Sequence, residues 1–250
     1  MSKEKKILED KVVVMTGGCG FLGKYFSDLL QEAGAKVIVT DVTKEADIIM
    51  DVTDQKAIDE VLKKISQEQG KIDVVINNAA IDPKFDIGAA QNKHEFVNYP
   101  EEAMQQSVNV NLLGTWRVCK GAIRVMCEQG FGNIVNVASF YGVTPPRQEI
   151  YPTGTEKPVD YALTKAGVIM LSRHIASQFG RSGIRCNVLA PGGVIKDQPK
   201  DWQERYSQHT SLGRMSTPEE VSDALLFLVS DQSRGMTGEC LVVDAGWRSR

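Results

Sequence analysis

Seven short runs of aliphatic, mostly β-branched residues alternate with helical patterns along this chain of 250 residues. The runs are apolar throughout, as in strands that are buried on both faces of a sheet. Strands of this kind that alternate with helices predict a doubly wound parallel sheet with helices on both faces. The predicted strands are Val12–Met15, Val37–Val39, Ile48–Met50, Val74–Ile76, Ile134–Val137, Cys186–Leu189 and Leu241–Val243.

Helical patterns lie between these strands, and the last of them has a strong start signal. Residues 216–220 read Ser-Thr-Pro-Glu-Glu, which supplies a capping hydroxyl, a proline for the first turn and two acids at the positive end of the helix. No repeat, low-complexity tract or linker divides the sequence, so we expect residues 1–250 to form one α/β domain. The helices are expected near residues 21–33, 54–68, 100–128, 159–179 and 218–230.

Composition excludes several classes of partner. The net charge of −3 gives no basic field that would attract nucleic acid or anionic lipid. No apolar stretch approaches the ~20 residues that span a bilayer, and the charged segment Met1–Lys11 lacks the apolar run of a signal peptide. The cysteines and histidines have no metal-binding spacing, which favours reduced thiols, no metal and a cytoplasmic location. These residues are Cys19, Cys119, Cys127, Cys186, Cys240, His94, His174 and His209.

A glycine-rich turn follows the first predicted strand directly and leads into the first helix. It reads Thr16-Gly-Gly-Cys-Gly-Phe-Leu-Gly23. Glycines at 17, 20 and 23 permit a tight turn, a close approach of the backbone to a pyrophosphate and close packing of helix on strand. The exposed N–H groups and the helix dipole then hold negative charge. Three glycines are common in turns, but this position at the first strand–helix junction predicts a Rossmann-type dinucleotide site.

Asp41, at the end of the second strand, predicts which dinucleotide binds. A carboxylate there hydrogen-bonds the ribose hydroxyls and repels a 2′-phosphate, which favours NAD over NADP. Lys44 lies nearby in the sequence and softens that preference. The alternative is an ordinary aspartate in a turn at the end of a strand.

Tyr161 and Lys165 lie four residues apart, on one face of the helix expected at 159–179. A free tyrosine has a pKa of about 10, so acting near neutrality requires stabilising its phenolate by roughly 4 kcal/mol. A cation about 4 Å away supplies a similar amount at an effective dielectric constant near 20. The spacing therefore suits a tyrosine that transfers protons, although the same spacing is common by chance.

With these motifs in this order, nearly the whole chain resembles the short-chain dehydrogenase/reductase family. The further segments that carry the resemblance are Asn77–Ala80, Asn111–Gly114, Ile134–Ser139, Pro191–Val194 and Asp244–Gly246. The resemblance implies that Tyr161 is the general acid/base and that Lys165 lowers its pKa and binds the nicotinamide ribose. It implies that Ser139 hydrogen-bonds the reacting oxygen and that Asn111 passes the proton toward solvent.

The resemblance also implies the cofactor contacts. They come from the glycine-rich turn, the ends of the second, third and fourth strands, the catalytic helix and the segment after the sixth strand. The implied contacts are Gly17, Cys19, Gly20, Phe21, Leu22, Gly23, Asp41, Asp51, Val52, Asn78, Ala79, Ala80, Tyr161, Lys165, Pro191, Gly192 and Val194.

Three features depart from the family pattern. The glycine spacing is typical of the longer epimerase/dehydratase branch, and a sugar-nucleotide epimerase or dehydratase is therefore the alternative enzyme. Lys196 stands where the family usually has a threonine that touches the cofactor. The segment between Ser139 and Tyr161 is longer than in compact members. Its Tyr151 has Thr155, not lysine, four residues later, and so is not the catalytic tyrosine.

The long segment suggests a hydrophilic substrate, because it is rich in hydrogen-bonding groups that an apolar ligand would leave unpaired. We expect a sugar derivative that contacts Ser139, Tyr161, Arg147 and Tyr151, and a weaker resemblance to dehydrogenases of bacterial nonulosonic-acid pathways points the same way. The alternatives are a solvated loop, an oligomer contact or, for the whole chain, a non-catalytic dinucleotide sensor. The polar residues are Arg147, Gln148, Glu149, Tyr151, Thr153, Thr155 and Lys157, with Lys196, Asp197, Gln198 and Lys200 after the sixth strand.

The helix at Tyr161–Phe179 is apolar around much of its circumference, as in a helix that is buried or in an interface. The family resemblance implies that it pairs across a homodimer, usually within a homotetramer.

Overall fold

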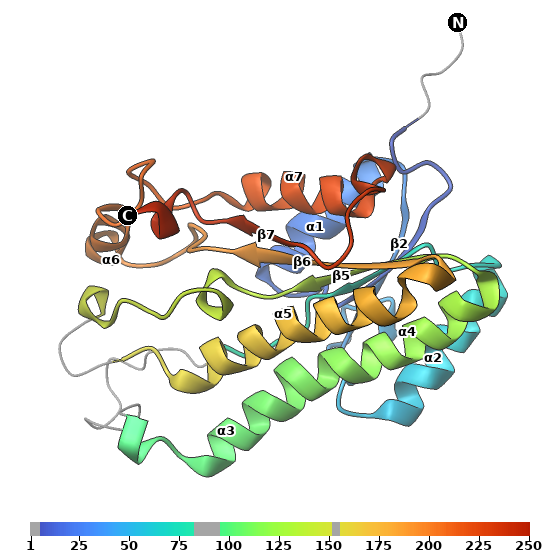
Figure 1. The fold of residues 1–250 in the computed structure, drawn as a ribbon, viewed down its shortest axis with the longest axis horizontal. Coiled ribbons are helices and arrows are strands. Elements are labelled where there is room, and N and C mark those ends of the chain that lie inside the picture. Colours follow the sequence, from blue (N-terminus) through green and yellow to red (C-terminus); the bar gives the residue numbers. More distant parts are fainter. Residues whose placement is uncertain (1–5, 83–95, 152–155) are drawn as a thin grey trace, which may run out of the picture.

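The computed structural model describes residues 6–82, 96–151 and 156–250. In these residues, seven parallel strands form one sheet in the order β3-β2-β1-β4-β5-β6-β7 (Figure 1). The predicted doubly wound Rossmann fold is confirmed, and every predicted strand is present. The strands are β1 (Val12–Thr16), β2 (Lys36–Asp41), β3 (Ile48–Ile49), β4 (Val74–Asn77), β5 (Gly132–Val137), β6 (Ile184–Pro191) and β7 (Cys240–Val243).

The strand order reverses at β1, and this reversal positions the site. β1 pairs with β2 on one side and with β4 on the other, so Thr16 lies between Thr40 and Asn77 at the carboxyl end of the sheet. In open α/β sheets, the crevice at such a reversal is where ligands bind.

Helices cover both faces of the sheet. α2, α4 and α5 pack on one face, and α1 and α7 pack on the other (Figure 1). The helix predicted near 100–128 is present without a break in the helical backbone. Its middle, Val108–Gly114, is a π-helical turn that separates the α-helices α3 and α4. The helices are α1 (Phe21–Glu32), α2 (Gln55–Gln69), α3 (Glu101–Ser107), α4 (Thr115–Gln129), α5 (Val159–Phe179), α6 (Lys200–Ser207) and α7 (Pro218–Val229).

The predicted start of α7 is confirmed as a reciprocal cap. The Thr217 hydroxyl accepts from the Glu220 N–H at 3.3 Å, and the Glu220 carboxylate accepts from the Thr217 N–H at 2.9 Å. α6 was not predicted. Across the described ranges, none of the helices combines the length and the apolar character needed to cross a bilayer.

Candidate active site

The end of β4 holds the glycine-rich turn in place. Thr16 Oγ1 accepts from the main-chain N–H groups of Asn78 and Ala79, each at 3.2 Å. Asn78 Nδ2 donates to the Gly17 carbonyl at 2.7 Å. Two segments that lie far apart in the sequence thus meet at the crevice, as the cofactor prediction requires.

The turn is too tight for side chains at two of its predicted glycines. Gly17 has a φ of +64°, and a Cβ there would lie 2.5 Å from Ala79 Cα. A Cβ at Gly23 would lie 2.5 Å from the Gly17 carbonyl oxygen. Glycines at these two positions therefore let the turn pack directly against the end of β4 and let α1 start close to the turn.

The cradle formed by this turn fits the pyrophosphate and ribose of a dinucleotide. Gly20 caps α1 without a side-chain hydrogen bond, and the first turn has no acidic residue, so its N–H groups are suited to bind an anion. Asp41 lies beside the turn, where its carboxylate accepts from the N–H groups of Cys19 at 3.1 Å and Val42 at 2.7 Å. The residues implied by the family resemblance are therefore compatible with NAD.

The third-strand residues lie further along the same edge. Asp51 Oδ1 accepts from the N–H and the hydroxyl of Thr53, each at 2.8 Å. The Val52 side chain is buried against the backbone of Gly114, where a Cβ would lie 2.8 Å from Val52 Cγ2. This contact brings the end of β3 against the π-helical turn.

Ser139 and Tyr161 meet at the carboxyl end of β5. Ser139 is buried and caps a short 3₁₀ turn, in which its hydroxyl accepts from the Tyr141 N–H at 3.2 Å. A hydrogen bond from the Ser139 hydroxyl also favours the ionised form of Tyr161. Gly142 lets the 3₁₀ turn after Ser139 pack closely against the backbone of α5, because a Cβ at this position would lie 2.7 Å from the Lys165 carbonyl carbon.

Burial opposes charge on both members of the Tyr161–Lys165 pair. It raises the pKa of Tyr161 well above the usual value, and the Asp82 carboxylate raises it further. Burial lowers the pKa of Lys165 to about 8. Lys165 Nζ donates to the Val137 carbonyl at 2.8 Å and lies 5.7 Å from the centroid of the Tyr161 ring. The buried ammonium of Lys165 therefore lies next to the Tyr161 ring.

Asn111 lies in the π-helical turn, and its side chain is engaged with the backbone. Its amide donates to the Ile81 carbonyl at 2.9 Å and accepts from the Ile81 N–H at 2.8 Å. A weaker contact of 3.4 Å reaches the Thr164 hydroxyl on α5. The side chain thus fixes the chain that follows β4, and the role of Asn111 in a proton relay stays a prediction. Single π-helical turns are frequent at functional sites.

Residues 18–248 match the family model described as enoyl-(acyl carrier protein) reductase, which is most of the chain. The chain belongs to the short-chain dehydrogenase/reductase family. The 3-oxoacyl-(acyl-carrier-protein) reductase FabG of Thermotoga maritima is 32% identical over 96% of this chain and 98% of its own. The post-translational flagellin modification protein A of Campylobacter coli is 27% identical over 96% of this chain and 99% of its own.

Solved structures agree with this membership. A crystal structure of a short-chain dehydrogenase from Leptospira borgpetersenii with bound NAD+ has a TM-score of 0.84 to this chain. The two are 30% identical, over 99% of this chain and 96% of that one. The protein is an NAD(P)-dependent oxidoreductase that acts on hydroxyl or carbonyl groups.

In this dehydrogenase, a second lysine lies closer to the centre of the Tyr161 ring than the motif lysine does. Lys157 Nζ is 4.3 Å from the centroid of the Tyr161 ring and forms an ion pair with Asp82. The Lys157 side chain is only 6% exposed. Sequence reasoning grouped Lys157 with the polar segment and did not place it at the tyrosine. Its position directly before Pro158, where α5 starts, was the available signal.

Aromatic side chains form the neighbouring wall. The Tyr141 and Tyr151 hydroxyls lie 2.8 Å apart, and both side chains are buried. Tyr151 faces Trp202, and Tyr206 accepts from the Gly193 N–H at 2.6 Å. The unpredicted α6 supplies Trp202 and Tyr206. Tyr151 therefore belongs to a packed aromatic cluster against which Tyr161 lies, and its contact with the substrate stays a prediction.

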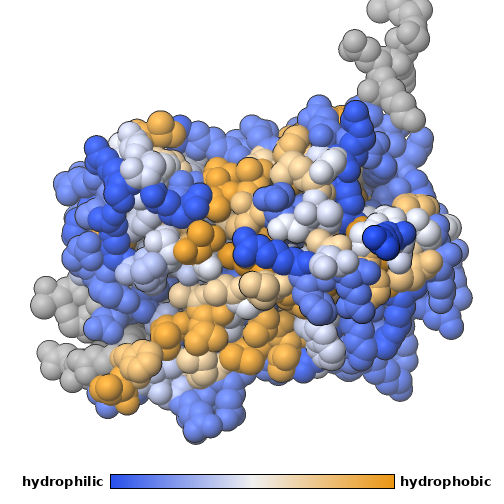
Figure 2. Space-filling model, viewed as in Figure 1, coloured by the Kyte–Doolittle hydropathy of each residue, from blue (hydrophilic) through white to orange (hydrophobic). Residues whose placement is uncertain are grey.

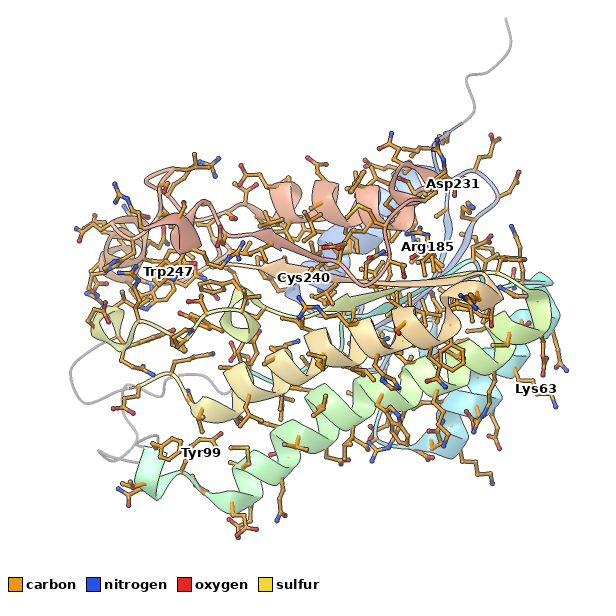
Figure 3. The ribbon with its side chains drawn as sticks, in the orientation of Figure 1. Lys63, Tyr99, Arg185, Asp231, Cys240 and Trp247 are labelled. Atoms are coloured by element: carbon orange, nitrogen blue, oxygen red, sulfur yellow. The ribbon has the colours of Figure 1, made fainter. Side chains whose placement is uncertain are left out.

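Arg147 lies against the C-terminal segment. Its guanidinium lies 3.3 Å from His209 Nδ1, donates to the Arg250 carbonyl at 2.9 Å and stacks over the Trp247 ring. Trp247 lies beside α6 at one end of the molecule (Figure 3). These contacts hold Arg147 against the C-terminal segment, and its contact with the substrate stays a prediction. Thr153, Thr155 and His94 lie outside the described residues.

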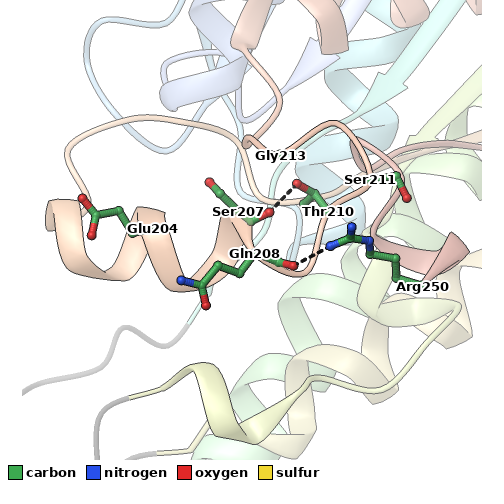
Figure 4. A pocket seen from close by; sticks show the side chains of 7 residues that line it. All are labelled: Glu204, Ser207, Gln208, Thr210, Ser211, Gly213 and Arg250. Carbon is green, nitrogen blue, oxygen red and sulfur yellow. Dashed lines mark hydrogen bonds between the residues drawn. The ribbon is translucent and has the colours of Figure 1, made fainter.

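A hollow of about 480 Å³ lies next to these C-terminal residues (Figure 4). Arg250 lines it and donates to the Gln208 carbonyl at 2.8 Å. The hollow borders α6 and the turn after it, and the predicted cofactor and catalytic residues do not line it. Its lining residues are Glu204, Ser207, Gln208, Thr210, Ser211, Gly213 and Arg250.

The segment after β6 returns toward the glycine-rich turn. Gly192 N–H donates to the Val243 carbonyl at 2.7 Å, and Val194 pairs with Ser216. Lys196 Nζ then lies 5.1 Å from the centroid of the Phe21 ring, at the first residue of α1. The lysine that replaces the usual family threonine thus lies beside the phosphate cradle.

Proposed function

We propose that Ser139, Tyr161 and Lys165 carry out the reaction of this dehydrogenase. The observation behind this is the contact of the Ser139 hydroxyl with Tyr161, next to the buried Lys165 and at the crevice where β1 meets β4. A hydroxyl, a phenol and an ammonium at one point are the groups that alcohol–carbonyl interconversion requires.

The proton transfers follow from this arrangement. In oxidation, the Tyr161 phenolate takes the proton of the substrate hydroxyl while the C–H hydrogen leaves with its electron pair and the C–O bond becomes a C=O bond. The bound nicotinamide supplies the acceptor for that electron pair. In reduction, Tyr161 returns the proton to the carbonyl oxygen. Ser139 orients this oxygen in both directions, and the Lys165 charge favours the phenolate.

We infer that NAD is preferred over NADP. The Asp41 carboxylate, beside the Cys19 N–H, stands where the adenosine ribose of a dinucleotide in this cradle would lie. A 2′-phosphate at that position would meet a negative charge. Asn78 and Ala79, which hydrogen-bond Thr16 and Gly17 beside this turn, support the same cofactor.

We further propose a small hydrophilic substrate, such as a sugar derivative. Charged and hydroxyl groups lie around Tyr161: the Lys157–Asp82 ion pair and the hydroxyls of Tyr141 and Tyr151. A steroid or acyl chain would desolvate these groups without replacing their hydrogen bonds.

A substrate screen tests both proposals. Formation of NADH is followed over sugars, polyols and hydroxy acids, with 3-hydroxyacyl thioesters and steroid alcohols as apolar comparators and NADP in parallel. We expect the highest kcat/KM on a polyhydroxylated or acidic substrate with NAD. Turnover of the apolar comparators alone would contradict the substrate class, and Tyr161→Phe with wild-type turnover would contradict the catalytic assignment.

We propose that the enzyme is a homodimer or homotetramer that pairs through the helix Tyr161–Phe179. Figure 2 shows an apolar area over α5. Leu163 and Met170 on this helix are 53% and 60% exposed, and Trp116 on the neighbouring α4 is 44% exposed. An apolar patch of this kind is typical of an interface. The five free thiols suit a reducing compartment, which supports a cytoplasmic location.

A further inference from the structure

Side-chain amides hold the backbone of Lys157 and the backbone of Ile81, the residue before Asp82, on either side of the Lys157–Asp82 ion pair. The Lys157 N–H donates to Gln148 Oε1 at 2.9 Å, and Gln148 Nε2 donates to the Lys157 carbonyl at 3.3 Å. Asp82 follows Ile81, whose N–H and carbonyl are both held by the Asn111 amide. Two side-chain amides, from different parts of the fold, thus bring the charges together. These hydrogen bonds distinguish the Lys157–Asp82 pair from an ordinary ion pair on the surface, whose side chains move freely.

The pair is placed against the catalytic tyrosine. Lys157 Nζ lies over the Tyr161 ring at 4.3 Å from its centroid, closer than Lys165 Nζ at 5.7 Å. A cation over an aromatic face is attracted by the ring, and the attraction grows when the ring carries the negative charge of a phenolate. The Asp82 side chain is 54% exposed, whereas that of Lys157 is 6% exposed. The cation is therefore the less screened member of the pair.

The two charges act on Tyr161 in opposite directions. Lys157 favours the phenolate, and Asp82 disfavours it, since like charges repel. The pKa of Tyr161 is indeed raised by Asp82. The other groups that face Tyr161 are Ser139 at the end of β5, Lys165 on α5, and the phenols of Tyr141 and Tyr151.

We propose that Lys157 is a second cation of this site, a positioning residue with Asp82 as its counter-ion, and that the balance of the two charges sets the pH at which Tyr161 gains and loses its proton. This inference rests on the proposed function, in which Tyr161 transfers the proton. The long segment between Ser139 and Tyr161 then has a role, because it supplies both Lys157 and Gln148, whose side-chain amide holds the Lys157 backbone.

The test measures ionisation of Tyr161 directly and needs no substrate. The tyrosinate absorbance of the full-length protein with saturating NAD is titrated with pH, and the signal of Tyr161→Phe in the same background is subtracted. Lys157→Met should raise the pKa of Tyr161 by about one, which is a tenfold change in the ionisation constant. Asp82→Asn should lower it, Lys157→Arg should stay near wild type, and the Lys157→Met/Asp82→Asn double variant should return toward wild type.

Opposite shifts from the two partners separate this role from a structural one, because loss of an ion pair that only held the fold would disturb both variants in the same way. Lys71→Met is the matched control. It breaks the Lys71–Asp73 pair at the amino end of β4, away from Tyr161, and should leave the titration unchanged. Shifts of the same sign, or no shift, in Lys157→Met and Asp82→Asn would overturn the proposal. Failure of the proposed function would differ: Tyr161→Phe would then retain turnover.

Discussion

The ammonium of Lys165 donates to the main-chain carbonyl of Val137 at 2.8 Å, so the end of β5 fixes a buried charge next to Tyr161. Lys165 is only 4% exposed, and this burial lowers the pKa of its ammonium to about 8. Burial also raises the pKa of Tyr161. Each group is thus disfavoured in its charged form by burial. The Lys165 ammonium and the Tyr161 phenolate stabilise each other's charge, which suits a pair that transfers a proton.

Loss of the phenol should stop the chemistry and spare the cofactor. Tyr161→Phe removes only the proton-transfer group, and we expect kcat to fall at least about 100-fold. NAD affinity, measured by calorimetry, should stay within a few-fold of wild type. Lys165→Ala should impair both quantities, because the lysine serves the tyrosine and the ribose. A Tyr161→Phe enzyme that keeps most of its rate would refute the assignment.

The buried Lys165 should give the folding stability a pH dependence of known sign. Its pKa falls from 10.5 in the unfolded chain to about 8 in the fold, so between these values the unfolded state binds more protons. Stability should therefore rise with pH over this window, by about 3 kcal/mol relative to Lys165→Met. Urea unfolding of both proteins at several values between pH 8 and 10.5 measures the difference. A constant difference would show that Lys165 titrates normally.

The fold was predictable because its signals are local. Apolar strands and the start of α7 follow from residues adjacent in sequence, as the Thr217–Glu220 cap shows. α6 escaped prediction because its segment is strongly hydrophilic. Its buried Tyr206 and the nearby Trp202 gain their places only from the aromatic cluster built by distant parts of the chain.

The site was predictable as far as motifs reach. Ser139, Tyr161 and the glycine-rich turn lie where their motifs implied, since each follows directly from a strand or helix end. Arg147 and Lys157 were not separable by sequence, because both are basic residues of one polar segment. The fold directs Arg147 to the Arg250 carbonyl and Lys157 to Tyr161.

Cofactor choice should depend on Asp41. We expect NAD to be the better cofactor by at least about tenfold in kcat/KM, or about 1.4 kcal/mol. Asp41→Ser should narrow this gap, because the repulsion of a 2′-phosphate is removed. Glu45 is an exposed carboxylate four residues after Asp41, so Glu45→Ser is the matched control. It should leave the ratio of kcat/KM with NAD to that with NADP unchanged. Equal use of NAD and NADP by the unaltered enzyme would contradict the prediction.

Lys196 should contribute to binding of the cofactor phosphates. Its ammonium lies near Phe21 at the start of α1, where the open N–H groups face the cradle. Lys196→Met should weaken NAD about tenfold, with the largest loss at low ionic strength, because salt screens a partly exposed charge. Lys200→Met, at the start of α6, should leave the affinity for NAD unchanged. Calorimetry at two salt concentrations gives both results, and equal affinities for wild type and Lys196→Met would rule the contact out.

The exposed face of α5 should hold the oligomer together. Met170 is 60% exposed on a helix whose other sides are buried, and a charge placed there would be desolvated without a partner in an interface. We expect Met170→Glu to shift the protein from a dimer or tetramer to smaller species in light scattering after size-exclusion chromatography. Ile49→Glu is the control, because Ile49 is 62% exposed on the edge strand β3 at the opposite end of the sheet from β7. If Ile49→Glu dissociates the protein and Met170→Glu does not, the interface lies at the β3 edge and not on α5. A wild-type protein that is monomeric at every concentration would remove the interface altogether.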